Sequence, residues 1–179
     1  MEVIKTKILD CYQIQPNKFK DDRGSFIKTF HQEIFQDLGL VTDFAEDYYS
    51  FSYQNVIRGL HFQIPPQDHI KIVYCVCGTV MDVVVDLRVD SPSYGQFALF
   101  DLSAEKGNLI YIPPGMAHGF EVISETAILM YKVSTVYSAE HDRGILWNSV
   151  GIPWQTTEPI MSQRDRSFVT LDNFSSPFL

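Results

Sequence analysis

Short apolar runs separated by turn residues constrain the fold of this chain more than any other feature of its sequence. The runs KIVYCVC at 71–77 and VMDVVVDL at 80–87 are rich in β-branched and aromatic residues, which favour extended strands. Gly78 and Thr79 lie between them, so we interpret the two runs as a β-hairpin. Further strands are predicted at 52–63, 96–102, 108–112, 119–123 and 126–134.

Helical periodicity is scarce by comparison. The best candidate is 32–40 (QEIFQDLGL), a short segment that is closed by a glycine. Many short strands with frequent turns and almost no helix indicate an antiparallel sandwich or jelly roll. The length of 179 residues suits one domain, so we expect a single domain over 1–179. Within it, 148–179 is irregular and contains prolines and serines, and we expect this tail to wrap the barrel.

Composition and charge exclude several classes of protein. The 14 Lys and Arg residues against 22 Asp and Glu give a net charge of -8, which disfavours a general nucleic-acid binder because such a protein needs a basic face. No apolar run approaches the roughly 18 residues of a membrane helix. The three cysteines have no C-x-x-C spacing, and the first residues lack a signal-peptide pattern. We therefore expect a cytoplasmic protein with neither nucleic-acid nor membrane partners.

Charged residues inside apolar strands are the first candidates for chemistry. The segment NVIRGLHFQ at 55–63 places Arg58 and His61 among residues that otherwise belong in a core, where an unpaired charge is costly. They could form a structural ion pair and a core histidine, or a ligand site. Gly59 favours the second interpretation, because a glycine inside a strand often marks a bulge or a close backbone approach.

Strand alternation gives two further candidates. Lys71 shares a face with Val73 and Cys75, and Tyr131 shares a face with Ala127 and Leu129. Each side chain could point into the barrel. Alternatively, the lysine could extend from a strand end into water, and the tyrosine could simply pack.

A histidine motif lies further along the chain. The segment IPPGMAHGF at 112–120 has the P-x-G-x-x-H spacing of the second half of the cupin pattern. The first half would supply H-x-H, but here the nearest equivalent is His61, Phe62 and Gln63. His61 and His118 alone fall short of a typical ligand set, so no metal is expected. Asp165 could belong to a solvated charge cluster, or it could orient a histidine.

Several segments, in order and over nearly the whole chain, resemble one family. They are DDRGSF at 21–26, NVIRGLHFQ at 55–63, IKIVYCVCGTVMDVVVDLRVDSPSYG at 70–95, IYIPPGMAHGF at 110–120, MYKVSTVYSAEHDRGILWN at 130–148 and PIMSQRD at 159–165. In these motifs the chain resembles the dTDP-4-dehydrorhamnose 3,5-epimerases, which are sugar-nucleotide epimerases of the cupin superfamily. The resemblance implies an all-β, cupin-like antiparallel jelly-roll barrel with short peripheral helices.

The resemblance also implies a reaction. The substrate is a nucleotide-linked 4-keto-6-deoxyhexose, whose ketone acidifies the protons on carbons 3 and 5. A base removes a proton, an enolate forms, and an acid returns a proton to the opposite face, without a redox cofactor or a metal. By resemblance His61 is the base, Asp165 the carboxylate bonded to it, Lys71 the cation near the enolate oxygen, and Tyr131 the acid.

Binding residues follow from the same resemblance. The family forms homodimers with exchanged N-terminal strands, so we expect a homodimer in which Arg23 reaches across to the partner's site. The enzyme would serve deoxysugar or surface-polysaccharide biosynthesis. The positions expected to bind the sugar or the nucleotide are Arg23, Phe26, Glu46, Tyr48, Arg58, Gln63, His118, Tyr137, Asp142 and Arg166.

Some positions depart from the family pattern. The family commonly has Gln and Asn where this chain has Glu46 and Tyr48, Glu where it has Lys28 and Asp142, and Gln where it has His69. Because Lys28 and Glu46 change sign together, we hypothesise an ion pair between them.

Four other functions remain as alternatives. One is a mono-epimerase acting at carbon 3 only or carbon 5 only, on a CDP- or GDP-linked sugar. Another is a sugar-nucleotide 3,4-ketoisomerase, against which the RGLHxQ and YKxSTxY segments argue. The others are a non-catalytic sugar-nucleotide binder and a metal-dependent cupin, which the missing H-x-H disfavours.

Overall fold

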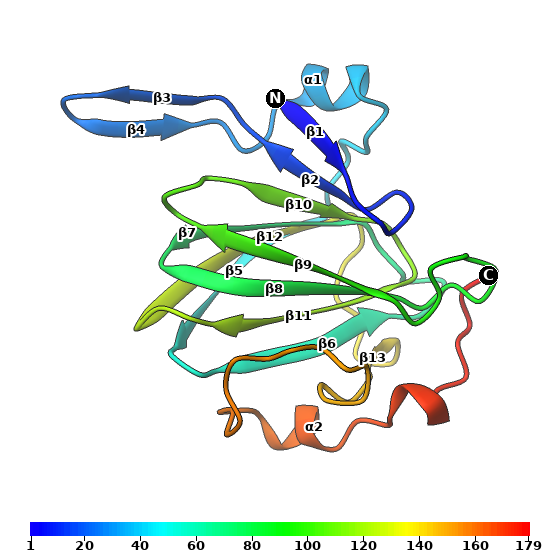
Figure 1. Cartoon of the computed structure of the whole chain (residues 1–179). Helices are drawn as coiled ribbons and strands as arrows, with labels where there is room; N and C mark the ends of the chain where they lie inside the picture. Colours follow the sequence, from blue (N-terminus) through cyan, green and yellow to red (C-terminus); the bar gives the residue numbers. More distant parts are fainter.

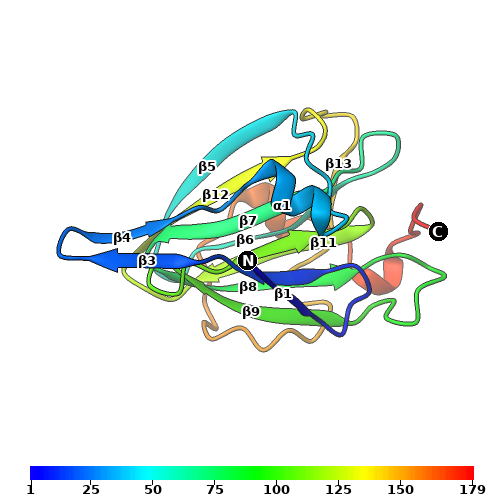
Figure 2. The same ribbon diagram turned by 90° about the horizontal axis from the view of Figure 1, so that it is seen from above.

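Two antiparallel sheets face each other across an apolar interior (Figures 1 and 2). The computed structural model describes residues 1–179. The six-stranded sheet has the order β1 (Glu2–Lys5), β2 (Tyr12–Gln15), β10 (Leu109–Ile112), β7 (Lys71–Cys77), β12 (Thr126–Val133) and β5 (Glu46–Tyr53). The five-stranded sheet has the order β13 (Asp142–Gly144), β6 (Ile57–Gln63), β11 (Met116–Val122), β8 (Thr79–Asp86) and β9 (Phe97–Ser103).

The remaining elements are small and peripheral. Strands β3 (Lys18–Asp21) and β4 (Gly24–Ile27) form a separate two-stranded hairpin that projects from the body. The helices are α1 (Gln32–Asp37), α2 (Gln163–Arg166) and a 3₁₀ turn at Leu171–Asn173. The predicted all-β class with short peripheral helices is thus confirmed. No helix has the length and apolar character needed to cross a membrane.

The predicted hairpin of β7 and β8 is wrong. β7 pairs with β10 and β12 in one sheet, whereas β8 pairs with β9 and β11 in the other. The chain crosses between the sheets at Gly78, which has a φ of +78°. A Cβ at this position would lie 2.0 Å from the Thr126 carbonyl oxygen, so only glycine fits this crossing.

The predicted strand at 52–63 is two strands that belong to different sheets. β5 begins at Glu46 and ends at Tyr53, and β6 begins at Ile57. Asn55, with a φ of +62°, turns the chain between them, since asparagine tolerates the left-handed region better than most residues. The other predicted strands and the helix agree with the structure to within a few residues at their ends.

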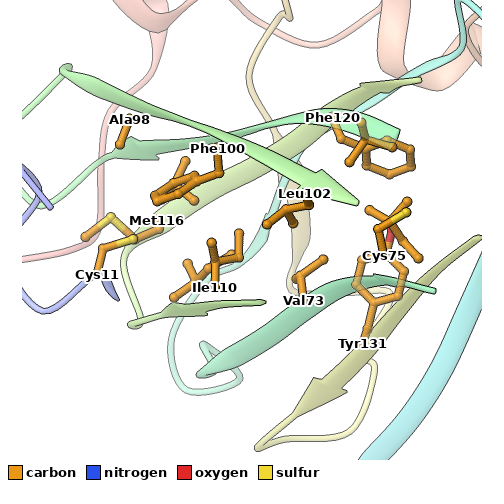
Figure 3. Packing of buried hydrophobic residues seen from close by; sticks show 14 of the residues in the cluster. Cys11, Val73, Cys75, Ala98, Phe100, Leu102, Ile110, Met116, Phe120 and Tyr131 are labelled. Carbon is orange, nitrogen blue, oxygen red and sulfur yellow. The ribbon is translucent and has the colours of Figure 1, made fainter. Parts of the chain in front are cut away.

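Three apolar clusters pack against the faces of the two sheets. The largest contains 17 buried residues and fills the space between the sheets (Figure 3). A second covers the outer face of the five-stranded sheet, where Leu60 and Phe62 pack against Phe178 from the tail. A third lies on the outer face of the six-stranded sheet, where Phe35 of α1 packs with Ile14 and Ile72. Burial of these apolar side chains is the main favourable term for the fold.

The C-terminal tail runs along the five-stranded sheet (Figure 1). Ile160 forms a parallel bridge with Val56, and the buried carboxylate of Glu121 accepts the backbone N–H groups of Gln155 and Thr156. These contacts fix the course of the tail before it reaches α2 beside β6.

Candidate active site

A cavity of about 470 Å³ lies between the two sheets, on the side of β5 and β6. The large core cluster fills the rest of the interior, and Tyr131 and Phe120 belong to both the cluster and the cavity wall. Figure 3 places these two side chains with Cys75 at one end of the cluster. The lining comes from six strands, two loops and helix α2: Glu46, Tyr48, Ser50, Arg58, His61, Phe62, Gln63, His69, Lys71, His118, Phe120, Tyr131, Val133, Thr135, Tyr137, Asp142 and Arg164.

A bulge in β6 brings Arg58 and His61 to the same wall. Residues three apart in a regular strand point to opposite faces. Here His118 of β11 pairs with His61 and Phe120 pairs with Arg58, so β6 carries one extra residue. Gly59 lies in this bulge with a φ of +137°, and a Cβ there would approach the Gly119 Cα to 2.7 Å.

His61 is held by a carboxylate from the tail. Its Nε2 lies 3.0 Å from Oδ1 of Asp165, and Oδ2 of the same carboxylate accepts the Gly59 backbone N–H at 3.1 Å. Burial raises the pKa of Asp165, but the His61 contact and these hydrogen bonds outweigh it and hold the pKa below its ordinary value. An ionised Asp165 requires the proton on Nε2, which leaves Nδ1 of His61 as a free base.

Tyr131 projects from the opposite sheet. Its hydroxyl lies 3.1 Å from Oγ of Ser50, and its ring stacks on Tyr48 with a centroid distance of 4.8 Å. Burial raises the pKa of Tyr131, and the Ser50 hydroxyl offsets this only in part. The phenol is therefore a protonated group and a potential proton donor.

Lys71 and a second histidine–aspartate pair occupy the floor of the cavity. His118 Nε2 lies 2.9 Å from Oδ2 of Asp82, and both side chains are almost fully buried. Burial lowers the pKa of His118 and raises that of Asp82. Burial also lowers the pKa of Lys71 to about 8, although Asp82 and Asp142 oppose this. An ammonium in this position would favour a negative charge that develops in the cavity.

The mouth of the cavity carries charged and aromatic groups. Oε1 of Glu46 accepts the Tyr137 backbone N–H at 3.0 Å, and Asp142 forms an ion pair of 2.7 Å with Arg164. Arg58 donates from Nε to Ser52 and from Nη2 to the Phe51 carbonyl, so part of its donor set remains available to a ligand.

Most of the side chains predicted from the sequence converge here. His61, Lys71 and Tyr131 line the cavity, and Asp165 lies behind His61. The predicted binding positions that line it are Glu46, Tyr48, Arg58, Gln63, His118, Tyr137 and Asp142.

Three predicted positions do not line the cavity of their own chain. Arg166 donates to the Pro159 carbonyl at 2.7 Å, so its guanidinium anchors the tail. Arg23 and Phe26 lie on the projecting hairpin of β3 and β4, where Arg23 pairs with Asp21 and Phe26 is 62% exposed. The hypothetical ion pair of Lys28 with Glu46 does not form within one chain, where Glu46 accepts the backbone N–H of Tyr137 instead.

Sequence reasoning missed several residues of the site. Ser50 and Thr135 line the cavity. His69, noted above only as a departure from the family pattern, also lines it, with its Nδ1 3.2 Å from the Gln63 amide nitrogen. Asp82 was the clearest omission, since it is a carboxylate inside the apolar run VMDVVVD. A buried charge in such a run needs a partner, and this signal could have linked it to His118.

The arrangement can move protons between two walls. A basic imidazole nitrogen faces the cavity from the five-stranded sheet, and a phenol and an ammonium face it from the six-stranded sheet. Such a pair can remove a proton from one face of a ligand and return one to the other. No group of three or more His, Cys, Asp or Glu side chains is arranged to hold a metal ion.

Comparisons with known proteins show which family this chain is similar to. A sequence model of the family described as dTDP-4-dehydrorhamnose 3,5-epimerase matches residues 5–173. The Shigella flexneri dTDP-4-dehydrorhamnose 3,5-epimerase is 42% identical over 180 residues, covering 97% of this chain and 99% of that protein. The Streptomyces niveus dTDP-4-dehydrorhamnose 3-epimerase is 36% identical, covering 89% of this chain and 79% of that protein.

A solved structure extends the similarity to the fold. The Legionella pneumophila dTDP-6-deoxy-D-glucose-3,5-epimerase, in complex with dTDP-4-keto-L-rhamnose, has a TM-score of 0.94 at 32% identity. The match covers 99% of this chain and 98% of that one.

Proposed function

The chain belongs to the dTDP-4-dehydrorhamnose 3,5-epimerase family, and from this premise we propose that it inverts carbons 3 and 5 of a dTDP-linked 4-keto-6-deoxyhexose. It is an isomerase. One observation carries the proposal: the His61–Asp165 pair faces Tyr131 and Lys71 across one cavity. The two walls supply the base and the acid that an inversion requires.

The first step is removal of a proton next to the ketone. Nδ1 of His61 takes the proton from carbon 3 or carbon 5. The C–H electron pair forms a double bond to carbon 4, and the ketone oxygen takes the negative charge of the enolate. The Asp165 carboxylate accepts the Nε2 proton of His61, so it favours the tautomer with a free Nδ1 and stabilises the imidazolium that results.

The second requirement is to hold the enolate oxygen. Lys71 lies on the wall opposite His61, and its pKa of about 8 keeps it largely protonated at neutral pH. A fixed, buried ammonium stabilises the developing charge without reorganisation. His118 beside it, held by Asp82, would contact the sugar.

The third step is proton return on the other face. The Tyr131 hydroxyl gives its proton to the carbon, and the Ser50 hydroxyl at 3.1 Å stabilises the phenolate until solvent restores the proton. Because Tyr131 and His61 belong to facing sheets, the new C–H bond forms opposite the one that was broken.

The mouth of the cavity would hold the nucleotide. Arg58 offers a guanidinium that suits a diphosphate, and Tyr137 is 62% exposed at the rim, where a base could stack on it. Glu46, Asp142 and Arg164 surround the same rim.

We also propose that the protein acts as a homodimer. The hairpin of β3 and β4 projects from the body, and the paired Phe19 and Phe26 on it are 61% and 62% exposed. Exposed apolar side chains that lie next to each other often mark an interaction site. A second copy of the chain would cover them and receive Arg23 in its cavity.

Mixed subunits test this sharing. His61→Ala and Arg23→Ala proteins should each have low activity, and unfolding and refolding a mixture should restore it in the heterodimer that has one intact site. A mixture no more active than its components would contradict a shared site.

Solvent exchange tests the reaction itself. In deuterium oxide, the wild-type protein should incorporate deuterium at carbons 3 and 5 of dTDP-4-keto-6-deoxyglucose, as followed by NMR. CDP- and GDP-linked sugars, run in parallel, should exchange more slowly. Deuterium at a single carbon would indicate a mono-epimerase, as the Streptomyces niveus relative is named, and binding without any exchange would contradict an epimerase.

A further inference from the structure

The inward face of the edge strand β5 holds several parts of the site in place. Glu46, Tyr48, Ser50 and Ser52 occupy alternate positions along this strand and therefore point to one side. Glu46 accepts the Tyr137 backbone N–H, Ser50 bonds the Tyr131 hydroxyl, and Ser52 accepts from Arg58. Each of these positions thus supports a neighbouring residue of the site.

Tyr48 supports Tyr131 through its ring. The two residues are directly opposite each other in the pairing of β5 with β12, and their rings are 4.8 Å apart with an interplanar angle of 15°. The His118 ring meets Tyr131 edge-on at 6.3 Å. The phenol is therefore bounded by Tyr48 on a ring face, by His118, and by Ser50 at its hydroxyl.

We infer that Tyr48 is a positioning residue for proton return: its ring stacks on Tyr131 and fixes the phenol at the angle from which it reaches the face opposite His61. This inference rests on the proposed function. It concerns the ring of Tyr48 and not its hydroxyl, because the contact with Tyr131 joins the two ring faces. A small displacement of a reacting group is enough to slow a reaction.

The enolate can be reprotonated in two ways, and the ratio of the two products distinguishes a positioning role of Tyr48 from a merely structural one. When Tyr131 returns the proton, the carbon is inverted. When His61 exchanges its proton with solvent and gives back a deuteron, the carbon gains deuterium with its configuration retained. The ratio of inverted product to exchange with retention therefore reports the position of Tyr131 and does not depend on how tightly substrate binds.

The test compares Tyr48→Leu, Tyr48→Phe and Tyr49→Leu under saturating substrate in deuterium oxide. Tyr49 is the neighbouring residue and is 68% exposed on the other face of β5. Loss of the stack in Tyr48→Leu should lower the inversion-to-exchange ratio by about tenfold. Tyr48→Phe, which keeps the ring, and Tyr49→Leu should stay within about twofold of the wild type.

Each other outcome overturns the inference. An unchanged ratio in Tyr48→Leu, or an equal loss of inversion and exchange, would mean that the stack does not position the acid. A ratio in Tyr48→Phe as low as in Tyr48→Leu would assign the effect to the hydroxyl. Failure of the proposed function is distinguishable, because the wild-type protein would then show neither inversion nor exchange.

Discussion

Two histidine–aspartate pairs face the same cavity, and they differ mainly in burial and in what holds the carboxylate. The His61 side chain is 31% exposed, and its partner Asp165 comes from the tail. The His118 side chain is 5% exposed, and its partner Asp82 belongs to the same sheet and is fully buried. The hydrogen-bond lengths, 3.0 Å and 2.9 Å, are nearly equal.

The difference shows what a base requires beyond a carboxylate partner. Burial lowers the pKa of His118, so its imidazole resists taking up a proton, and burial raises the pKa of Asp82, so its carboxylate is a weaker support for an imidazolium. Burial raises the pKa of Asp165, but the hydrogen bonds from His61 and from the Gly59 N–H outweigh this and keep the pKa lowered. We therefore assign proton transfer to the His61 pair and positioning to the His118 pair.

The largest expected effect is the loss of exchange in His61→Asn. Removing the base should reduce deuterium exchange by about 10²–10⁴-fold. The free energy of unfolding should change by no more than about 1 kcal/mol, because Asp165 keeps its bond from Gly59. NMR exchange rates and urea denaturation measure the two quantities. Exchange at the wild-type rate would remove His61 from the mechanism.

His118→Ala should reduce the free energy of unfolding far more than His61→Asn does. The substitution leaves the Asp82 carboxylate without its hydrogen-bonded partner in the apolar interior, and breaking a buried pair costs about 3–5 kcal/mol. Urea denaturation should therefore show a much larger loss of stability than in His61→Ala, the matched control. Equal losses in the two variants would mean that burial does not separate the pairs.

Lys71 gives a further test of the difference between the two histidine–aspartate pairs, because it lies beside the buried His118–Asp82 pair. Its pKa is lowered by burial to about 8, so the ammonium loses its proton as the pH rises through that value. The exchange rate, as kcat/KM, should fall above about pH 8 in the wild type. Lys71→Met should cost about 10²–10³-fold and abolish this alkaline limb. A limb that survives in Lys71→Met belongs to another group.

The sequence identified the elements of the site better than their arrangement. Alternation correctly placed Lys71 with Val73 and Tyr131 with Leu129, because the pairing of β7 with β12 is regular between Lys71 and Cys75. The same rule would separate Arg58 from His61, and only the extra residue at the Gly59 bulge reunites them. A bulge depends on how two strands pair, so local sequence can hint at it but cannot fix it.

Long-range contacts explain the other failures. The expected β7–β8 hairpin is absent because each strand finds its partners in a different sheet, through contacts that no local pattern encodes. Asp165 lies 104 residues from His61 along the chain, so only the family resemblance joined them in advance. The roles that we propose for Arg23 and Phe26 would need a second chain, which folding rules for one chain cannot supply.

The two carboxylates differ most clearly in the number of hydrogen-bond donors that they accept from. Asp165 accepts from two donors, the Gly59 N–H and His61 Nε2, whereas both oxygens of Asp82 face His118 Nε2 alone. An asparagine has one carbonyl oxygen. At 165 the fixed backbone donor takes that oxygen, so the amide NH₂ faces Nε2 and forces the proton onto Nδ1. At 82 the carbonyl can still serve His118.

The most direct test of the account is therefore the deuterium exchange rate of Asp165→Asn beside that of Asp82→Asn. We predict that Asp165→Asn loses about 10²-fold or more, because Nδ1 of His61 is no longer free to act as the base. Asp82→Asn should lose less than about tenfold. Wild-type exchange in Asp165→Asn, or a greater loss in Asp82→Asn, would contradict the assignment of His61 and its tail carboxylate as the proton-abstracting pair.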